Sequence, residues 1–410
     1  MLAAAKAEYG WGERVLKASE VFHTTPPDGL YRVGVRIAWL EFEGRKLRVV
    51  IWYPALEVEG AEPYVFKHDE IKAAVKGSAV LDAPPDRSGA PYPLIVYSPG
   101  LTGPADVSVF YTQNLASHGY ITIGIDHLDA GQWDLMFRDG NWRNLLRFFP
   151  RILKEFVVGN PSDTVLVAFS GHFRGTEFGL SYRPPEARLV FDQAAVWNED
   201  ASSPLHDMIA CDTIGMTGHS LGAWTSLLFG GMSLKYDAAL CSSDFSINRG
   251  CIADHDPGCT LSARSLENPF TLRDERVKAI LPMGSPIFHR NAPENAAEIK
   301  VPLLFLSGDD RRWEATVYRQ KEVYDSAPSP KYMVIIKDTD HFVICDMLLG
   351  SPYTRRAPLP RFRAHFREKA QAYKDYSAAF FDLYLRGDDG KAAILKEPNQ
   401  PFVKQVWHET

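Results

Sequence analysis

Apolar residues fall in short blocks along the chain, separated by segments long enough to form helices. We expect strands at residues 94–97, 120–125, 214–217, 277–281, 303–306 and 332–336. Near-continuous apolar strands that alternate with helices are typical of a mostly parallel sheet covered on both faces. Ahead of them, residues 33–42 and 46–53 flank Glu43-Gly44-Arg45, which predicts an antiparallel hairpin at one edge of the sheet. The pattern therefore predicts an α/β fold.

Two segments depart from this alternation and look like insertions. The first, residues 132–182, contains a helical pattern with one apolar face and one basic face. We interpret it as a cap helix packed on the body, with a lid or membrane-surface element near the active site as the alternative. The second insertion, residues 242–276, is a cysteine-bearing loop. Near the C-terminal end, residues 362–386 predict a long helix with an aromatic stripe, closed by Gly387.

Length and composition favour one globular domain. The 410 residues are 45% hydrophobic, so residues 1–410 can form a single α/β domain that includes both insertions. A net charge of -6 argues against a nucleic-acid surface. No apolar run approaches the length of a membrane span. Because no charged segment leads into a long apolar one at the N-terminus, we expect a cytoplasmic protein as written, although a trimmed exported form would look the same.

The five cysteines leave the redox state open. Cys241, Cys251 and Cys259 lie together in the second insertion, while Cys211 and Cys345 lie apart. One disulfide among the first three, or reduced thiols throughout, are both compatible with this spacing. The absence of any C-x-x-C pair makes a metal site unexpected.

The strongest chemical signal is the sequence Gly218-His219-Ser220-Leu221-Gly222, which follows the expected strand 214–217. A G-x-S-x-G pattern alone is weak, but between a strand and a helix it predicts a sharp turn with an exposed serine hydroxyl. The two glycines would let the helix and the strand approach closely. We therefore predict that Ser220 is a nucleophile.

A nucleophilic serine needs a base, and that base needs an acid to orient it. His341 follows the last expected strand, in the chain order Ser, Asp, His of hydrolases with this turn. We expect Asp310, which follows strand 303–306, to be the acid, with Asp309 as the alternative. His219 is interpreted as structural, and His127 precedes the serine in the wrong chain order.

The oxyanion of such a reaction needs backbone N–H donors. One should be Leu221, directly after the nucleophile, and the other Leu101, in the loop after strand 94–97. No metal ion or other cofactor is required by this chemistry.

Several of these segments resemble the platelet-activating factor acetylhydrolase and dienelactone-hydrolase-like branch of the α/β-hydrolases. They are residues 51–55, 93–101, 115–120, 183–186, 218–222 and 340–342. The resemblance implies an α/β-hydrolase fold and a metal-free serine esterase with Ser220, Asp310 and His341 as its triad and Leu101 and Leu221 in the oxyanion hole. Relatives often have His-Gly where this chain has Pro99-Gly100, but the expected donor is a backbone group.

These observations predict a serine esterase that cleaves a small-molecule or lipid-like carboxylic ester. The same triad acting on a thioester, an amide, a polymer ester or a carbon–carbon bond next to a ketone is the alternative. A degenerate hydrolase that only binds ligands would lack a triad member, and none is missing. Transient contact with a membrane surface stays open, as do the substrate and the oligomeric state.

Overall fold

The computed structural model describes residues 21–69, 71–130, 182–233, 272–285, 292–309, 314–351 and 365–410. The strands of these ranges are β1 Phe22–His23, β2 Arg32–Phe42, β3 Arg45–Ala55, β4 Val65–His68, β5 Ala73–Lys76, β6 Val80–Leu81, β7 Tyr92–Ser98, β8 Ile121–Ile125, β9 Ile209–His219, β10 Val277–Met283, β11 Leu303–Gly308, β12 Lys331–Ile336 and β13 Val403–Glu409. The helices are α2 Val109–Ser117, α7 Arg183–Glu199, α8 Leu221–Phe229, α11 Ala292–Ala296, α12 Glu314–Ser326, α13 Asp346–Leu349 and α16 Phe366–Arg386, with a 3-10 turn at Asp389–Lys391.

One large sheet organises the molecule, in the strand order β13-β12-β11-β10-β9-β7-β8-β3-β2-β6. The six strands from β12 to β8 pair in parallel, as the apolar blocks predicted. The predicted hairpin is β2–β3, antiparallel and joined to β8. The carboxyl ends of β7, β9, β10, β11 and β12 therefore meet along one edge, where an α/β sheet carries its chemistry.

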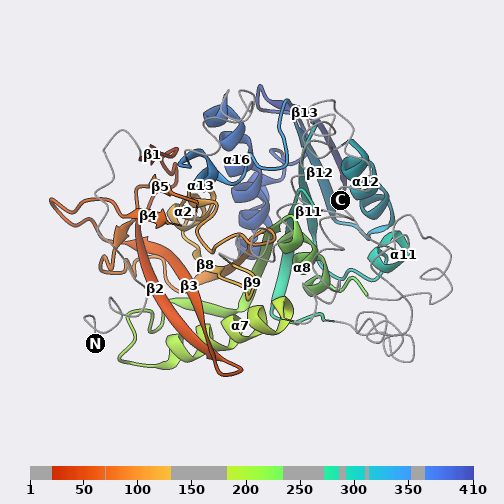
Figure 1. Cartoon of the computed structure of the whole chain (residues 1–410). Helices are drawn as coiled ribbons and strands as arrows, with labels where there is room; N and C mark the ends of the chain where they lie inside the picture. The colour runs from red at the N-terminus through yellow and green to blue at the C-terminus, as the bar shows by residue number, and fades with distance from the viewer. Residues whose placement is uncertain are drawn as a thin grey trace, which may run out of the picture.

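Successive side chains of each strand enter two different cores because side chains alternate across a sheet. On β7, Ile95 and Tyr97 belong to the core that includes α2 and α16, whereas Leu94 and Val96 belong to the core that includes α7, α8 and α12. Figure 1 shows these helices on either side of the strands. This two-sided burial explains the near-continuous apolar blocks.

The sequence pattern missed the shortest and most exposed strands. A second sheet, β1-β5-β4, consists of strands of two to four residues, too short to give a periodic signal. At the far edge of the large sheet, β13 pairs antiparallel with β12, and most of its side chains are polar or partly exposed. The predicted C-terminal helix is α16, which begins at Phe366 rather than 362 and ends before Gly387, whose φ is +70°.

Most of both expected insertions lies outside the described residues. Of the segment 132–182, only Tyr182 is described, and of the segment 242–276 only residues 272–276. Cys241, Cys251 and Cys259 also lie outside the described residues, whereas Cys211 and Cys345 are free thiols. Across the described helices, none combines the length and the apolar character that a membrane span requires.

Candidate active site

Ser220 occupies a strained turn between β9 and α8. The strand ends at His219, the helix begins at Leu221, and Ser220 between them has φ +55° and ψ -118°. Non-glycine residues rarely adopt positive φ, and such strain is concentrated at functional sites. The Ser220 N–H donates to the carbonyl of Met283 at 2.9 Å, so the end of β10 holds the turn.

The two glycines of the motif permit the close contact that this turn requires. A Cβ on Gly222 would lie 1.8 Å from the carbonyl oxygen of Ser98, and one on Gly218 would lie 2.3 Å from the carbonyl oxygen of Gly222. Either substitution would force the backbones of α8, β9 and β7 apart. The structure thus gives the physical reason for both glycines.

His341 lies in the loop after β12 and reaches the same edge of the sheet as Ser220. A Cβ on Gly284, the residue that follows Met283, would lie 3.3 Å from Nδ1 of His341. The ring of His341 is 4.5 Å from that of His219, centroid to centroid. Burial and the neighbouring His219 hold the pKa of His341 well below its ordinary value, which keeps this imidazole neutral and able to accept a proton.

Of the two candidate acids, the structure describes Asp309. Asp310 lies outside the described residues. Asp309 is described, and its Oδ1 accepts the backbone N–H of Asp338 at 2.6 Å while its Oδ2 lies 3.2 Å from Nζ of Lys404. The Asp309 carboxylate therefore braces the loop that leads to His341 and pairs with β13.

The loop after β7 passes beside the nucleophile. A Cβ on Gly100 would lie 3.3 Å from Cβ of Ser220. The loop closes through a hydrogen bond from the N–H of Gly103 to the carbonyl of Gly100 at 3.0 Å, with Thr102 at φ +61°. Leu101 lies inside this turn, and Leu221 is the first residue of α8, where backbone N–H groups have no partner within the helix. Both predicted oxyanion donors thus belong to segments that adjoin Ser220.

Sequence reasoning missed a buried polar network behind this loop. Oγ of Ser98 lies 2.8 Å from Nε2 of His127, whose Nδ1 lies 2.6 Å from the Glu186 carboxylate, which also accepts from Arg45. This Ser–His–Glu series resembles a triad, but all three side chains are at least 98% buried, so no substrate reaches them. Setting His127 aside as a base agrees with this burial.

Arg183 lies next to that network and is fully buried. Its guanidinium pairs with Asp129 at 2.7 Å and donates to the backbone carbonyl oxygens of Pro99 and Gly100. In the sequence, Arg183 and Glu186 belong to one of the segments that carry the family resemblance, but nothing there indicates that they contact the loop after β7.

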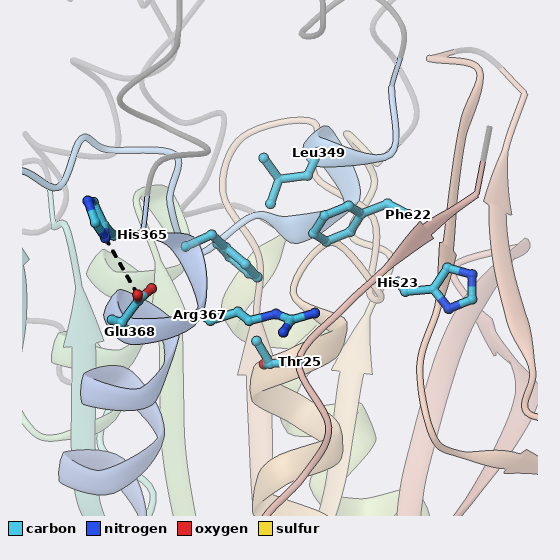
Figure 2. Close-up of a pocket in the computed structure, with 8 residues that line it drawn as sticks. Phe22, His23, Thr25, Leu349, His365, Arg367 and Glu368 are labelled. Atoms are coloured by element: carbon cyan, nitrogen blue, oxygen red, sulfur yellow. Dashed lines mark hydrogen bonds and ion pairs between the residues drawn. The ribbon is translucent and has the colours of Figure 1, made fainter. Parts of the chain in front are cut away.

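A separate pocket of about 340 Å³ lies at the start of α16. Figure 2 shows that β1 supplies Phe22 and His23 to it and that His365 and Glu368 face each other. Nδ1 of His365 lies 3.5 Å from Oε1 of Glu368. None of the candidate catalytic residues lines it. In the described ranges, no group of three or more His, Cys, Asp or Glu side chains could hold a metal ion.

Comparison with known proteins bears on the family resemblance and on the fold. The family model of platelet-activating factor acetylhydrolase, isoform II, matches residues 29–142, which confirms the resemblance over that segment. Curated protein sequences gave no match. Among solved structures, the fold is similar to a ferulic acid esterase from Streptomyces cinnamoneus, with a TM-score of 0.56 and 17% sequence identity over 93% of this chain and 98% of that one. The chain therefore has the α/β-hydrolase fold, as its sequence predicted.

Proposed function

We propose that this protein is a serine hydrolase that cleaves carboxylic esters through an acyl-enzyme intermediate. The observation that carries the proposal is the strained Ser220 turn, which adjoins both the His341 loop and the Gly100–Gly103 turn. The partial match to an acetylhydrolase family and the fold shared with a ferulic acid esterase favour an ester over the other acyl bonds.

In the proposed reaction, Oγ of Ser220 attacks the ester carbonyl carbon while His341 accepts the hydroxyl proton. The N–H groups of Leu101 and Leu221 stabilise the resulting oxyanion. Collapse of the tetrahedral intermediate breaks the bond to the alcohol, which leaves with the proton from His341. Water then attacks the acyl-enzyme while His341 accepts a proton from it. The bond from the acyl carbon to Oγ of Ser220 breaks, Oγ takes the proton back from His341, and the carboxylic acid is released.

Asp310 is our proposed partner of the His341 imidazole. Asp309, the first residue after the end of β11, engages Asp338 and Lys404, and Asp310 follows it directly in the chain. An acid in this place would fix the tautomer of His341 and stabilise its protonated form.

Ser220→Ala tests the proposal directly. With a short-chain p-nitrophenyl ester, we expect kcat to fall on the order of a millionfold, by analogy with other serine triads. Ser226→Ala is the matched control, because among the described residues the Ser226 hydroxyl donates to the Gly222 carbonyl within α8 and to no other group. A fluorophosphonate should label the unmodified protein and the control but not Ser220→Ala. Retained turnover in Ser220→Ala would refute the proposal.

A panel of substrates would then separate ester cleavage from the alternatives. We expect kcat/KM to be higher for carboxylic esters than for the matching thioesters, amides and ketones. Esters that vary in acyl length and in alcohol would show whether the substrate is small or lipid-like.

A further inference from the structure

We propose that Arg183 and Asp129 are positioning residues. They fix the backbone conformation of residues 99–102 (the oxyanion loop), which include the Leu101 donor. Neither side chain belongs to the proposed triad, yet together they bond Pro99, Gly100 and Thr102, on both sides of the Leu101 donor. The inference rests on the proposed function, since it concerns the oxyanion hole of that same reaction.

Arg183 fixes the first half of the loop through its carbonyl groups. Nη1 of Arg183 donates to the carbonyl of Pro99 at 2.6 Å, and Nη2 donates to that of Gly100 at 3.1 Å. The Gly100 carbonyl belongs to the peptide unit whose N–H is that of Leu101. A bond to this oxygen therefore sets the plane of the peptide and the direction in which the Leu101 N–H points.

Asp129 fixes the second half of the loop. Its Oδ2 accepts the N–H of Thr102 at 2.6 Å, and its two oxygens accept from Nη2 of Arg183 at 2.7 and 3.0 Å. Tyr182 donates its hydroxyl proton to Oδ1 of Asp129 at 2.8 Å. The peptide between Leu101 and Thr102 is thus tied down as well, so both peptide planes around Leu101 are determined.

Asp129 and Arg183 form a buried ion pair that stays charged. Asp129 is 1% exposed and Arg183 is fully buried. Burial raises the pKa of Asp129, but Arg183, His127 and the Thr102 N–H outweigh it and hold that pKa below its ordinary value. The Asp129 carboxylate therefore stays charged. A buried ion pair is weak evidence for stability in itself, since apolar replacements are often equally stable, and this leaves orientation of the loop as its role.

Pro99 is the residue before the glycine of this loop. Pro99 has no N–H and a fixed φ, so it stiffens the loop without taking part in hydrogen bonding as a donor. Its carbonyl accepts from Arg183. Backbone donors held in this way need no rearrangement as negative charge develops on the substrate oxygen.

Substitutions at Arg183 and Asp129 test the inference. Arg183→Lys keeps the charge but loses the fork that reaches two carbonyls, and the double variant Arg183→Met/Asp129→Leu removes both charges together so that neither is left buried alone. Arg188→Ala is the matched control, because Arg188 lies on the same helix but contacts Leu272 and Asp274 instead. Melting temperature and circular dichroism report folding.

Three readouts separate positioning from a merely structural role. We expect kcat to fall about 100-fold in the double variant and about tenfold in Arg183→Lys, with KM changed less than threefold. The Ki of a trifluoromethyl ketone, which forms an oxyanion on the serine, should rise in proportion to the loss in kcat/KM. The acid limb of the pH profile should not move, because His341 is untouched.

The inference is wrong if a folded variant keeps kcat within threefold, or if kcat falls while the trifluoromethyl ketone binds as before. If a variant does not fold, Tyr182→Phe takes its place, because it removes one hydrogen bond to Asp129. It should give a smaller fall in kcat and a proportional rise in the Ki of the trifluoromethyl ketone. No change in either quantity would count against the inference. Failure of the proposed function looks different, because Ser220→Ala would then retain turnover.

Discussion

The imidazole of His219 holds the backbone of His341: Nε2 of His219 lies 2.7 Å from the His341 carbonyl oxygen. A carbonyl can only accept, so Nε2 carries the proton, and Nδ1 is left to accept from the thiol of Cys345 at 3.6 Å. Burial lowers the pKa of His219 to about 4, so this tautomer persists at neutral pH. The residue before the nucleophile thus anchors the proposed base.

Replacing His219 should therefore impair catalysis by displacing His341. In His219→Phe the His341 carbonyl loses its donor, and we expect kcat to fall roughly tenfold to 100-fold and unfolding free energy to fall by about 1–3 kcal/mol. His219→Gln places an amide N–H near the position of Nε2, so this variant should retain most of the kcat and most of the unfolding free energy. Steady-state kinetics and urea unfolding measure the two quantities. Equal losses in the two variants would show that the hydrogen bond is unimportant.

Substitution of each candidate acid should identify the triad acid. We expect Asp310→Asn to lower kcat on the order of 10⁴-fold, because the imidazole would lose its orienting carboxylate. Asp309→Asn should cost less than about tenfold, since it only weakens the bonds to Asp338 and Lys404. The test is to measure kcat for a p-nitrophenyl ester and the melting temperature of both variants. A larger loss in Asp309→Asn would reverse the assignment.

The pH dependence of the reaction should follow His341. This imidazole must be neutral to accept the serine proton, so activity is lost as the pH falls through its pKa. Because burial and His219 lower that pKa well below 6.5, the acid limb of kcat/KM should lie below pH 6.5. A pH–rate profile with a non-ionising ester tests this. A half-maximal rate at pH 6.5 or above would contradict it.

Stability should depend on pH through Asp346, far from Ser220 in sequence. This fully buried carboxylate accepts the N–H groups of Val109 and Phe110 at 2.8 and 3.0 Å and the hydroxyl of Thr24. Burial raises its pKa to about 7 despite these bonds. The folded state then binds the proton more tightly than the unfolded state, so this group makes stability fall as the pH rises from about 4 to about 7.

Asp346→Asn removes this titration and should flatten that part of the stability profile, although it also weakens the bonds to α2. The difference in unfolding free energy between the unmodified protein and Asp346→Asn should change by at most roughly 4 kcal/mol between about pH 4 and about pH 7. Urea unfolding at several pH values measures it, with the surface variant Asp389→Asn as control. Parallel profiles for the unmodified protein and Asp346→Asn would disprove the expectation.

The sequence predicted the parts of the fold that follow from periodicity and local turn chemistry. The parallel strands, the β2–β3 hairpin, the end of α16 at Gly387 and the turn at Ser220 each depend on a few neighbouring residues. The network around Arg183 could not be predicted, because it joins Pro99, Asp129 and Arg183 across long stretches of chain through backbone carbonyls that leave no mark in the sequence. The contact from His219 to the His341 backbone was missed for the same reason.

The backbone of Ser220 has a consequence for evolution. Its φ of +55° and ψ of -118° form the mirror image of an extended conformation, which glycine adopts freely and serine does not. Ser220→Gly should therefore raise the melting temperature while it abolishes the proposed reaction. A more stable and inactive sequence lies one substitution away, so only selection for activity would keep a serine at this position.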